Sequence, residues 1–229
     1  MASDVDLSRR FQLIVFDWDG TLVDSTGLIA RSLQEACRDI GAAVPDESSA
    51  RHVIGLGLGD ALRYAAPAVP EARYPELAGH YRNHYVAREK EISLFDGVRE
   101  MLDELDAAGF LLAVATGKGR AGLERALALQ GLTRRFFATR CADEGRPKPH
   151  PDMLLHLMDC AGADPDTSLM IGDTSHDLEL ARNAGAAAVA VSWGAHPAGS
   201  LADFGALATV DSIAELRQWL RVNARAVAG

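Results

Sequence analysis

The chain has 229 residues, an apolar fraction of 48% and a net charge of −9, values typical of a globular protein that buries a full core. The negative charge and the lack of a basic run argue against nucleic acid and anionic membrane surfaces as partners. Residues 1–10 are polar and show no secretion segment, and no run approaches the roughly 18 apolar residues of a membrane span. The three cysteines are scattered without C-x-x-C spacing, which favours a reduced, cytoplasmic protein.

A buried strand is predicted at residues 13–16, and two carboxylates follow it directly, at Asp17 and Asp19. Burial and like charge both raise the free energy of such a pair, so a divalent cation nearby is expected. Gly20 permits a sharp turn, and Thr21 adds a hydroxyl beside the expected ion.

Residues 25–91 predict an all-helical insert, because apolar residues recur at helical spacing and no stretch alternates as a strand would. Ser25 is the expected N-cap of the first helix. We expect helices at residues 25–40, from 45 onward, at 60–66 and at 71–90, with glycines between the second and third.

The remainder of the chain alternates between helix and strand. We expect helices at residues 98–108, 121–130, 151–160, 177–183 and 213–222, strands at 110–115, 136–139, 168–171 and 186–191, and a loop at 194–205. This rhythm is typical of an α/β fold with a Rossmann-like parallel sheet and helices on both faces. We therefore predict a core domain at residues 1–24 and 92–229, with the helical cap domain at 25–91 inserted.

Polar side chains gather where the predicted strands end. In open parallel sheets, ligands bind beyond the carboxyl ends of the strands. Each residue alone has an ordinary explanation, since a strand-end threonine caps turns, a loop lysine is solvated, and two aspartates four residues apart charge a helix N-terminus. The residues concerned are Asp17, Asp19, Thr116, Lys148, Asp173 and Asp177.

The segment from Asp17 to Ser25, with sequence DWDGTLVDS, resembles the first motif of the haloacid dehalogenase-like hydrolases, in their phosphatase branch. Thr116, Lys148 and Asp173 match the other three motifs in order, and the resemblance extends from about residue 11 to 220. It implies a Mg²⁺-dependent phosphatase of the phosphoglycolate phosphatase-like group, acting on a small phosphorylated metabolite.

The resemblance also implies roles for the carboxylates. Asp17 would attack phosphorus to form an aspartyl-phosphate, and Asp19 would protonate the leaving alkoxide and later activate water. Asp17, Asp173 and the main-chain carbonyl of Asp19 would bind Mg²⁺, an ion suited to an all-oxygen site. Asp177 would orient a metal-bound water or the lysine.

Three further groups would neutralise the phosphoryl oxygens. Lys148 would pair with Asp17 and with these oxygens, while the Thr116 hydroxyl and the Gly117 N–H would donate to them.

Two other functions remain open on the sequence. A sugar-phosphate mutase of the same family would use these groups and shield the aspartyl-phosphate from water. A catalytically silent binding protein would share only the fold, although the retained motif residues argue against it. A dehalogenase is disfavoured, because the dehalogenases lack an acid/base aspartate at the position of Asp19.

In the insert, Arg51 and His52 precede the glycines of residues 55–59, a stretch that resembles the substrate-facing cap loop of the family. We expect Arg51 to bind a second anionic group of the substrate, such as the carboxylate of phosphoglycolate. The alternative, given equal weight, is that Arg51 and His52 lie on a solvated face of their helix. Of the other histidines, His150 is expected to be a loop residue and His176 to touch solvent near the site.

Overall fold

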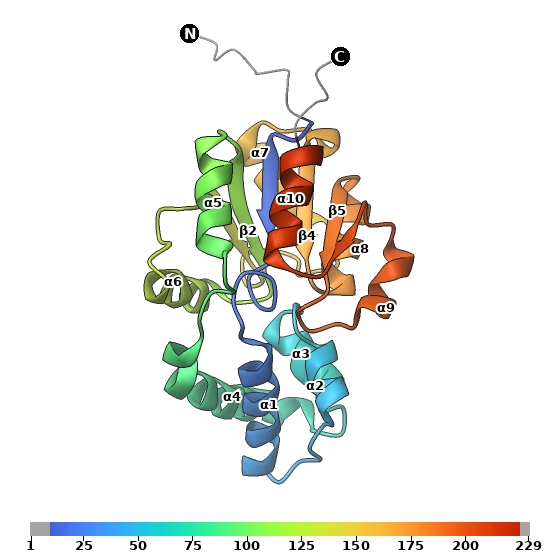
Figure 1. Cartoon of the computed structure of the whole chain (residues 1–229). Coiled ribbons are helices and arrows are strands. Elements are labelled where there is room, and N and C mark those ends of the chain that lie inside the picture. The colour runs from blue at the N-terminus through green and yellow to red at the C-terminus, as the bar shows by residue number, and fades with distance from the viewer. Residues whose placement is uncertain (1–9, 225–229) are drawn as a thin grey trace.

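The structure, a computed structural model, describes residues 10–224. Within this range, six parallel strands form one sheet in the order β3-β2-β1-β4-β5-β6 (Figure 1). The strands are β1 (Leu13–Phe16), β2 (Leu111–Thr116), β3 (Ala138–Cys141), β4 (Ser168–Gly172), β5 (Ala187–Val191) and β6 (Thr209–Val210). Two expectations concern residues 1–9, which lie outside the described residues: that they belong to the core domain and that they contain no secretion segment. Residues 225–229, also assigned to the core domain, lie outside the described residues as well.

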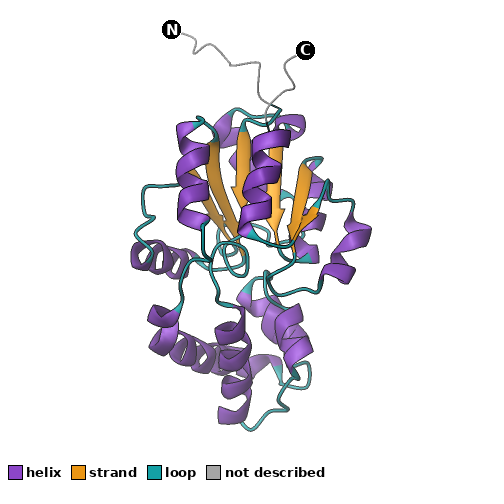
Figure 2. Ribbon diagram, in the orientation of Figure 1, coloured by secondary structure: helices purple, strands orange, loops and turns teal. Residues whose placement is uncertain are grey.

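Strand β1 lies between β2 and β4, and all four of its residues are buried. Its side chains alternate between two apolar layers. Ile14 and Phe16 belong to the layer under α5 (Val98–Ala107), α6 (Arg120–Leu129) and α10 (Ile213–Asn223). Leu13 and Val15 belong to the layer under α7 (Asp152–Ala161) and α8 (Ser175–Ala184). Helices therefore cover both faces of the sheet, which confirms the predicted fold class (Figure 2).

The segment between β1 and α5 forms a separate helical unit beyond the carboxyl ends of the strands (Figure 1). We use the name cap for residues 25–91, the range predicted for the insert. Its helices are α1 (Thr26–Asp39), α2 (Glu47–His52), α3 (Leu58–Ala65) and α4 (Tyr74–Arg88), and short 3₁₀ turns, η1 (Glu71–Arg73) and η2 (Glu89–Glu91), flank α4. A cluster of its own, around Leu33, Leu62 and Leu77, holds these helices together.

Two predicted segments differ from the sequence expectations. Strand β3 covers residues 138–141 rather than 136–139, because its pairing with β2 begins at Ala138; Phe136 packs on the core and Phe137 is 52% exposed, just before the strand. The predicted loop at 194–205 contains a short helix, α9 (Ala198–Leu201), and a 3₁₀ turn, η4 (Ala202–Phe204); another 3₁₀ turn, η3 (Pro165–Thr167), precedes β4.

Strand β6 was not expected, because two residues are too few for a periodic pattern. Within residues 10–224, no helix has the length and apolarity that crossing a membrane requires.

Candidate active site

Asp17 follows β1 directly and is 1% exposed. Its Oδ1 accepts a hydrogen bond from Lys148 Nζ at 2.8 Å, and the lysine side chain is fully buried. Lys148 comes from the loop between β3 and α7, so the fold joins two segments that are far apart in sequence. The predicted pairing of lysine and aspartate is present.

Asp177 is the second partner of the lysine, with 2.5 Å between Lys148 Nζ and Asp177 Oδ1. Its other oxygen accepts from the backbone N–H and the hydroxyl of Thr174, at 3.1 and 2.7 Å. These bonds belong to a capping box at the start of α8. Asp177 therefore caps a helix and positions Lys148 at the same time.

Asp173, just after β4, is fully buried. Its Oδ1 accepts from the Thr21 hydroxyl and its Oδ2 from the Ala195 N–H, both at 2.7 Å. A Cβ on Gly20 or Gly194 would collide with this carboxylate, so the two glycines leave room for it. Two loops from separate parts of the chain, one after β1 and one after β5, thus fix its orientation.

The cluster has an excess of negative charge. Carboxylate oxygens of Asp17, Asp173 and Asp177 lie within 4.8 Å of one another, and the ammonium of Lys148 contacts two of them, Asp17 and Asp177. Burial raises the pKa of Asp17 despite Lys148, and burial with the charge of Asp177 raises the pKa of Asp173 to about 7. Burial opposes the charge of Lys148, but Asp17 and Asp177 outweigh it and raise the pKa of the ammonium, which stays charged.

The same cluster fits a divalent cation. Asp17 Oδ2 is buried and has no hydrogen-bond partner among the described residues, an arrangement that is costly unless another group satisfies it. The donors are all oxygens, which suits a hard ion such as Mg²⁺. The oxygens of Asp173 accept only neutral donors, whereas Asp177 Oδ1 already accepts the ammonium of Lys148 and its Oδ2 is held in the helix cap, so Asp17 and Asp173 are the better ligands.

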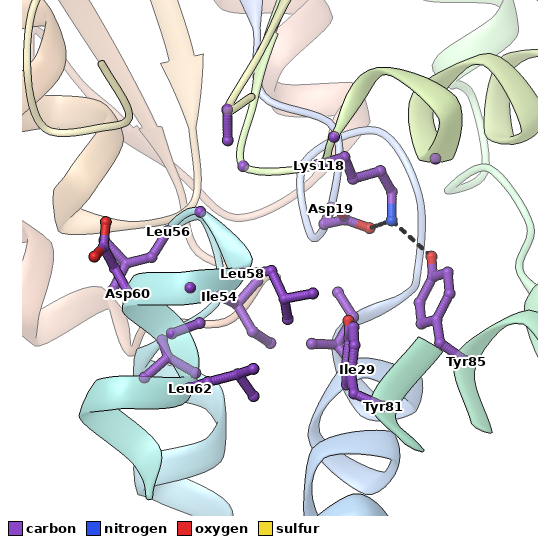
Figure 3. A pocket seen from close by; sticks show the side chains of 18 of the residues that line it. Asp19, Ile29, Ile54, Leu56, Leu58, Asp60, Leu62, Tyr81, Tyr85 and Lys118 are labelled. Atoms are coloured by element: carbon purple, nitrogen blue, oxygen red, sulfur yellow. Dashed lines mark hydrogen bonds and ion pairs between the residues drawn. The ribbon is translucent and has the colours of Figure 1, made fainter. Parts of the chain in front are cut away.

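Asp19, two residues after Asp17, is 6% exposed. Its Oδ1 accepts from the Ser25 hydroxyl at 2.6 Å and lies 3.1 Å from Lys118 Nζ. Lys118 in turn donates to the Tyr85 hydroxyl of α4 at 2.8 Å (Figure 3). Burial of Lys118 opposes the charge of its ammonium, yet the nearby Asp19 carboxylate raises the pKa of Lys118 above its ordinary value. A cation from the core thus links Asp19 to the cap.

Thr116 and Gly117 lie where the cap meets the core. Thr116 is fully buried, and its Oγ accepts the Lys118 N–H at 3.1 Å, which leaves the hydroxyl proton to donate elsewhere. A Cβ on Gly117 would lie 2.6 Å from the carbonyl oxygen of Gly55 and 2.5 Å from that of Leu56. The cap loop therefore rests directly on Gly117, and only glycine fits there.

Three histidines form a second contact between cap and core. The Nε2 atoms of His176 and His196 lie 3.2 and 3.0 Å from the main-chain oxygen of His52, and the rings of His52 and His196 stack. His196 Nδ1 accepts the Ser175 N–H, so its Nε2 carries the proton that is donated. His176 is 9% exposed, so the expectation that it touches solvent is wrong.

A cavity of about 610 Å³ lies between cap and core. Asp19, Gly117 and Lys118 border it on the core side, and Figure 3 shows Ile54, Leu58 and other cap side chains on the facing wall. The remaining predicted residues of the cluster lie buried behind this border. The cavity thus opens onto the Asp19 side of the cluster.

The structure does not bring Arg51 to this cavity. Its Nε lies 2.8 Å from Glu47 Oε1 and its NH1 donates to the Thr26 hydroxyl at 3.1 Å, on another side of the cap. Arg51 forms an ion pair with the carboxylate one helical turn before it, as residues at positions i and i+4 commonly do. His150 is a loop residue, as expected, and accepts the Asp152 N–H.

Sequence reasoning missed some contacts of the site. Lys118 directly follows the predicted Thr116 and Gly117, so its position was a usable signal. Ser25 was expected to cap α1, but its hydroxyl makes no cap bond and donates to Asp19 instead. Tyr85 carried no local signal, because it belongs to a cap helix far from the motifs.

Comparisons with known proteins agree with this geometry. The family model described as haloacid dehalogenase-like hydrolase matches residues 14–191. The chain is 37% identical over 211 residues to the probable phosphatase IndB of Dickeya dadantii, covering 89% of this chain and 91% of that protein. It is 34% identical over 188 residues to phosphoglycolate phosphatase of Agrobacterium fabrum, covering 80% and 81%. A crystal structure described as a predicted phosphoglycolate phosphatase from Haemophilus somnus matches with a TM-score of 0.80 and 26% identity, over 91% and 97% of the two chains.

Proposed function

The chain belongs to the haloacid dehalogenase-like hydrolases and is a phosphatase of their phosphoglycolate phosphatase-like group, and we propose that it hydrolyses a small phosphorylated metabolite in a Mg²⁺-dependent reaction through an aspartyl-phosphate. The observation that carries the proposal is the unpartnered Oδ2 of Asp17, buried in a cluster of three carboxylates and one ammonium. Such a cluster holds a nucleophilic carboxylate oxygen next to a site that can bind a cation.

Mg²⁺ would be held by Asp17 and Asp173, with the Asp19 main-chain carbonyl as a further ligand by family resemblance, and it would neutralise charge on the phosphoryl group. Lys148 holds the Asp17 carboxylate in place through Oδ1 and places a permanent positive charge beside the reacting atoms. The Thr116 hydroxyl and the Gly117 N–H donate to the phosphoryl oxygens, where transition-state charge collects.

The reaction takes two steps. An oxygen of Asp17 forms a bond to phosphorus while the bond to the leaving alkoxide breaks, and Asp19 gives that alkoxide its proton. Water then forms a bond to phosphorus and loses a proton to Asp19, and the bond between phosphorus and the Asp17 oxygen breaks. Free phosphate leaves, the Asp17 carboxylate is restored, and Asp19 again carries its proton.

Asp17 is 1% exposed under the cap, so the cap must move away before a phosphate group can reach it. The contact between Gly117 and the Gly55–Leu56 backbone marks the surface that separates. Closure afterwards excludes bulk water from the phosphoryl group and brings Lys118 against Tyr85.

The test is a phosphate-release assay on a panel of phosphate monoesters. We expect turnover with Mg²⁺, no turnover with chelator, and restoration by added Mg²⁺. Asp17→Asn should abolish turnover while the protein still folds, as circular dichroism checks, whereas Asp159→Asn, at an exposed position of α7, should behave as wild type.

Rapid acid quenching with ³²P-labelled substrate should trap label on wild-type protein and none on Asp17→Asn. Full turnover in chelator, or label on Asp17→Asn, would contradict the proposal. Phosphoryl transfer between sugar positions without free phosphate would favour the mutase instead.

A further inference from the structure

The cavity between cap and core has an apolar wall. Its facing side consists mainly of aliphatic cap residues from α1, α3 and the loop before α3, with an aromatic ring from α4 (Figure 3). The side chains that define this wall are Ile29, Ile54, Leu56, Leu58, Leu62 and Tyr81. Because burial of apolar surface is favourable and burial of unpaired polar groups is not, the wall selects an apolar occupant.

Most charged side chains around the cavity are already engaged; Arg82, an exposed residue of α4 that also borders it, has no ion-pair partner among the described residues. Asp60 and Arg63 pair with each other at 3.0 Å at the exposed rim, and Arg125 pairs with Glu89 at 3.0 Å. Inside, Lys118 is bound by Asp19 and Tyr85. The deeper wall therefore holds no cation of its own for a second anionic group, and Arg51 lies elsewhere.

The position of Asp19 identifies which part of the substrate the cavity holds. In the proposed reaction Asp19 protonates the leaving-group oxygen, so it must touch that oxygen. Asp19 borders the cavity, whereas Asp17, Thr116 and Lys148 lie behind it. The chain of atoms beyond the leaving oxygen must then extend into the cavity.

The size of the cavity excludes a two-carbon leaving group as its full occupant. About 610 Å³ is within the range of pockets that enclose ligands of drug size, far larger than glycolate. A sugar of suitable size would place hydroxyl groups against aliphatic side chains, where they would lack partners.

We propose that the preferred substrate is the phosphate monoester of a bulky, mainly apolar alcohol, whose hydrocarbon part lies against the cap wall. This inference rests on the proposed function, because it uses Asp19 as the group that meets the leaving oxygen. It names the substrate class that the cavity selects.

A series of n-alkyl phosphates from propyl to octyl tests the inference. The alcohols in this series differ little in pKa, so the chemical step is the same for each ester. Changes in kcat/KM therefore report burial of the alkyl group. We expect kcat/KM to rise roughly fourfold per methylene, equivalent to about 0.8 kcal/mol, until the cavity is filled. Phosphoglycolate and glucose 6-phosphate should fall below octyl phosphate.

A pair of matched variants locates the effect. Gly122 in α6 borders the cavity, and Gly79 in α4 does not; a Cβ on either meets nothing within 4 Å. Both substitutions to Phe are therefore expected to fold. Gly122→Phe should lower the ratio of octyl to propyl kcat/KM about tenfold or more, and Gly79→Phe should preserve that ratio.

The outcomes separate this inference from the proposed function. Turnover of the series with a flat or falling dependence on length, or a preference for phosphoglycolate, would overturn the substrate class and leave the phosphatase intact. An equal effect of the two variants on the ratio would also overturn it. Failure of every ester to release phosphate would overturn the proposed function and, with it, this inference.

Discussion

Lys148 Nζ lies 2.8 Å from Asp17 Oδ1 and 2.5 Å from Asp177 Oδ1, and all three side chains are at most 1% exposed. The ammonium joins the end of β1 to the start of α8, so it contributes to the fold as well as to the site. Its loss would leave two buried carboxylates without the cation they share.

Lys148→Met should therefore destabilise the protein by about 3–5 kcal/mol, measured by urea unfolding in chelator. The control is Lys90→Met, because Lys90 lies exposed in η2, where a substitution changes stability by about 0.5 kcal/mol or less. Equal stability of the two variants would show that the buried pairs contribute nothing.

Asp19→Asn should slow turnover of alkyl phosphates by roughly 10²–10⁴-fold, the contribution typical of a general acid. The loss on 4-nitrophenyl phosphate should be much smaller, because that leaving group departs without a proton. Steady-state kinetics on both esters provide the measurement, with Asp24→Asn, an exposed aspartate of the same loop, as control. An equal loss on both esters would remove the acid role from Asp19.

Mg²⁺ should stabilise the folded protein in addition to activating it. At a concentration 100 times its dissociation constant, a bound ion contributes about 2.7 kcal/mol, which calorimetry detects as a higher melting temperature. Asp173→Asn should lose this gain. Ca²⁺ should raise the melting temperature yet support little turnover, because its looser coordination misaligns the reacting groups. An unchanged melting temperature with Mg²⁺ would argue against the ion site.

Gly117→Ala should impair closure of the cap, because the added methyl group would meet the carbonyl oxygens of Gly55 and Leu56. We expect kcat/KM to fall on the order of 10²-fold, as for other small misplacements of reacting groups. Gly79→Ala is the matched control, since its Cβ has open space and Gly79 does not border the cavity. Comparable activity of both variants would show that the closed arrangement is dispensable.

The histidines between cap and core predict a loss of stability in acid. Burial lowers the pKa of His176 to about 4; the hydrogen bond to the His52 main-chain oxygen and the charge of Asp177 oppose this shift, and charge on the His196 and His52 rings adds to it. Burial also lowers the pKa of His196. The unfolded chain therefore binds more protons than the folded chain between the two pKa values, and stability falls as pH drops from 6.5 toward 4.

For His176 alone this loss is on the order of 3 kcal/mol, since each pKa unit corresponds to about 1.4 kcal/mol. Urea unfolding between pH 7 and 4 measures the dependence, and His176→Phe should flatten it. An equal slope in wild type and variant would assign the acid sensitivity to other groups.

The sequence alone determined the alternation of strands and helices and the helical insert, because hydrophobic periodicity is a local property. It also determined which polar residues follow the strands, and parallel strands bring their carboxyl ends to one edge. Asp17, Lys148, Asp173 and Asp177 accordingly meet where the motifs predicted.

Only the tertiary structure decided how the cap meets this cluster. The link from Asp19 through Lys118 to Tyr85, the histidines around the His52 carbonyl and the apolar cavity all join segments with no local relation in sequence. Arg51 illustrates the reason: a long side chain reaches several carboxylates, and only packing decides that Glu47 is its partner. Contacts between distant segments depend on the relative placement of two separately packed units, which local patterns do not encode.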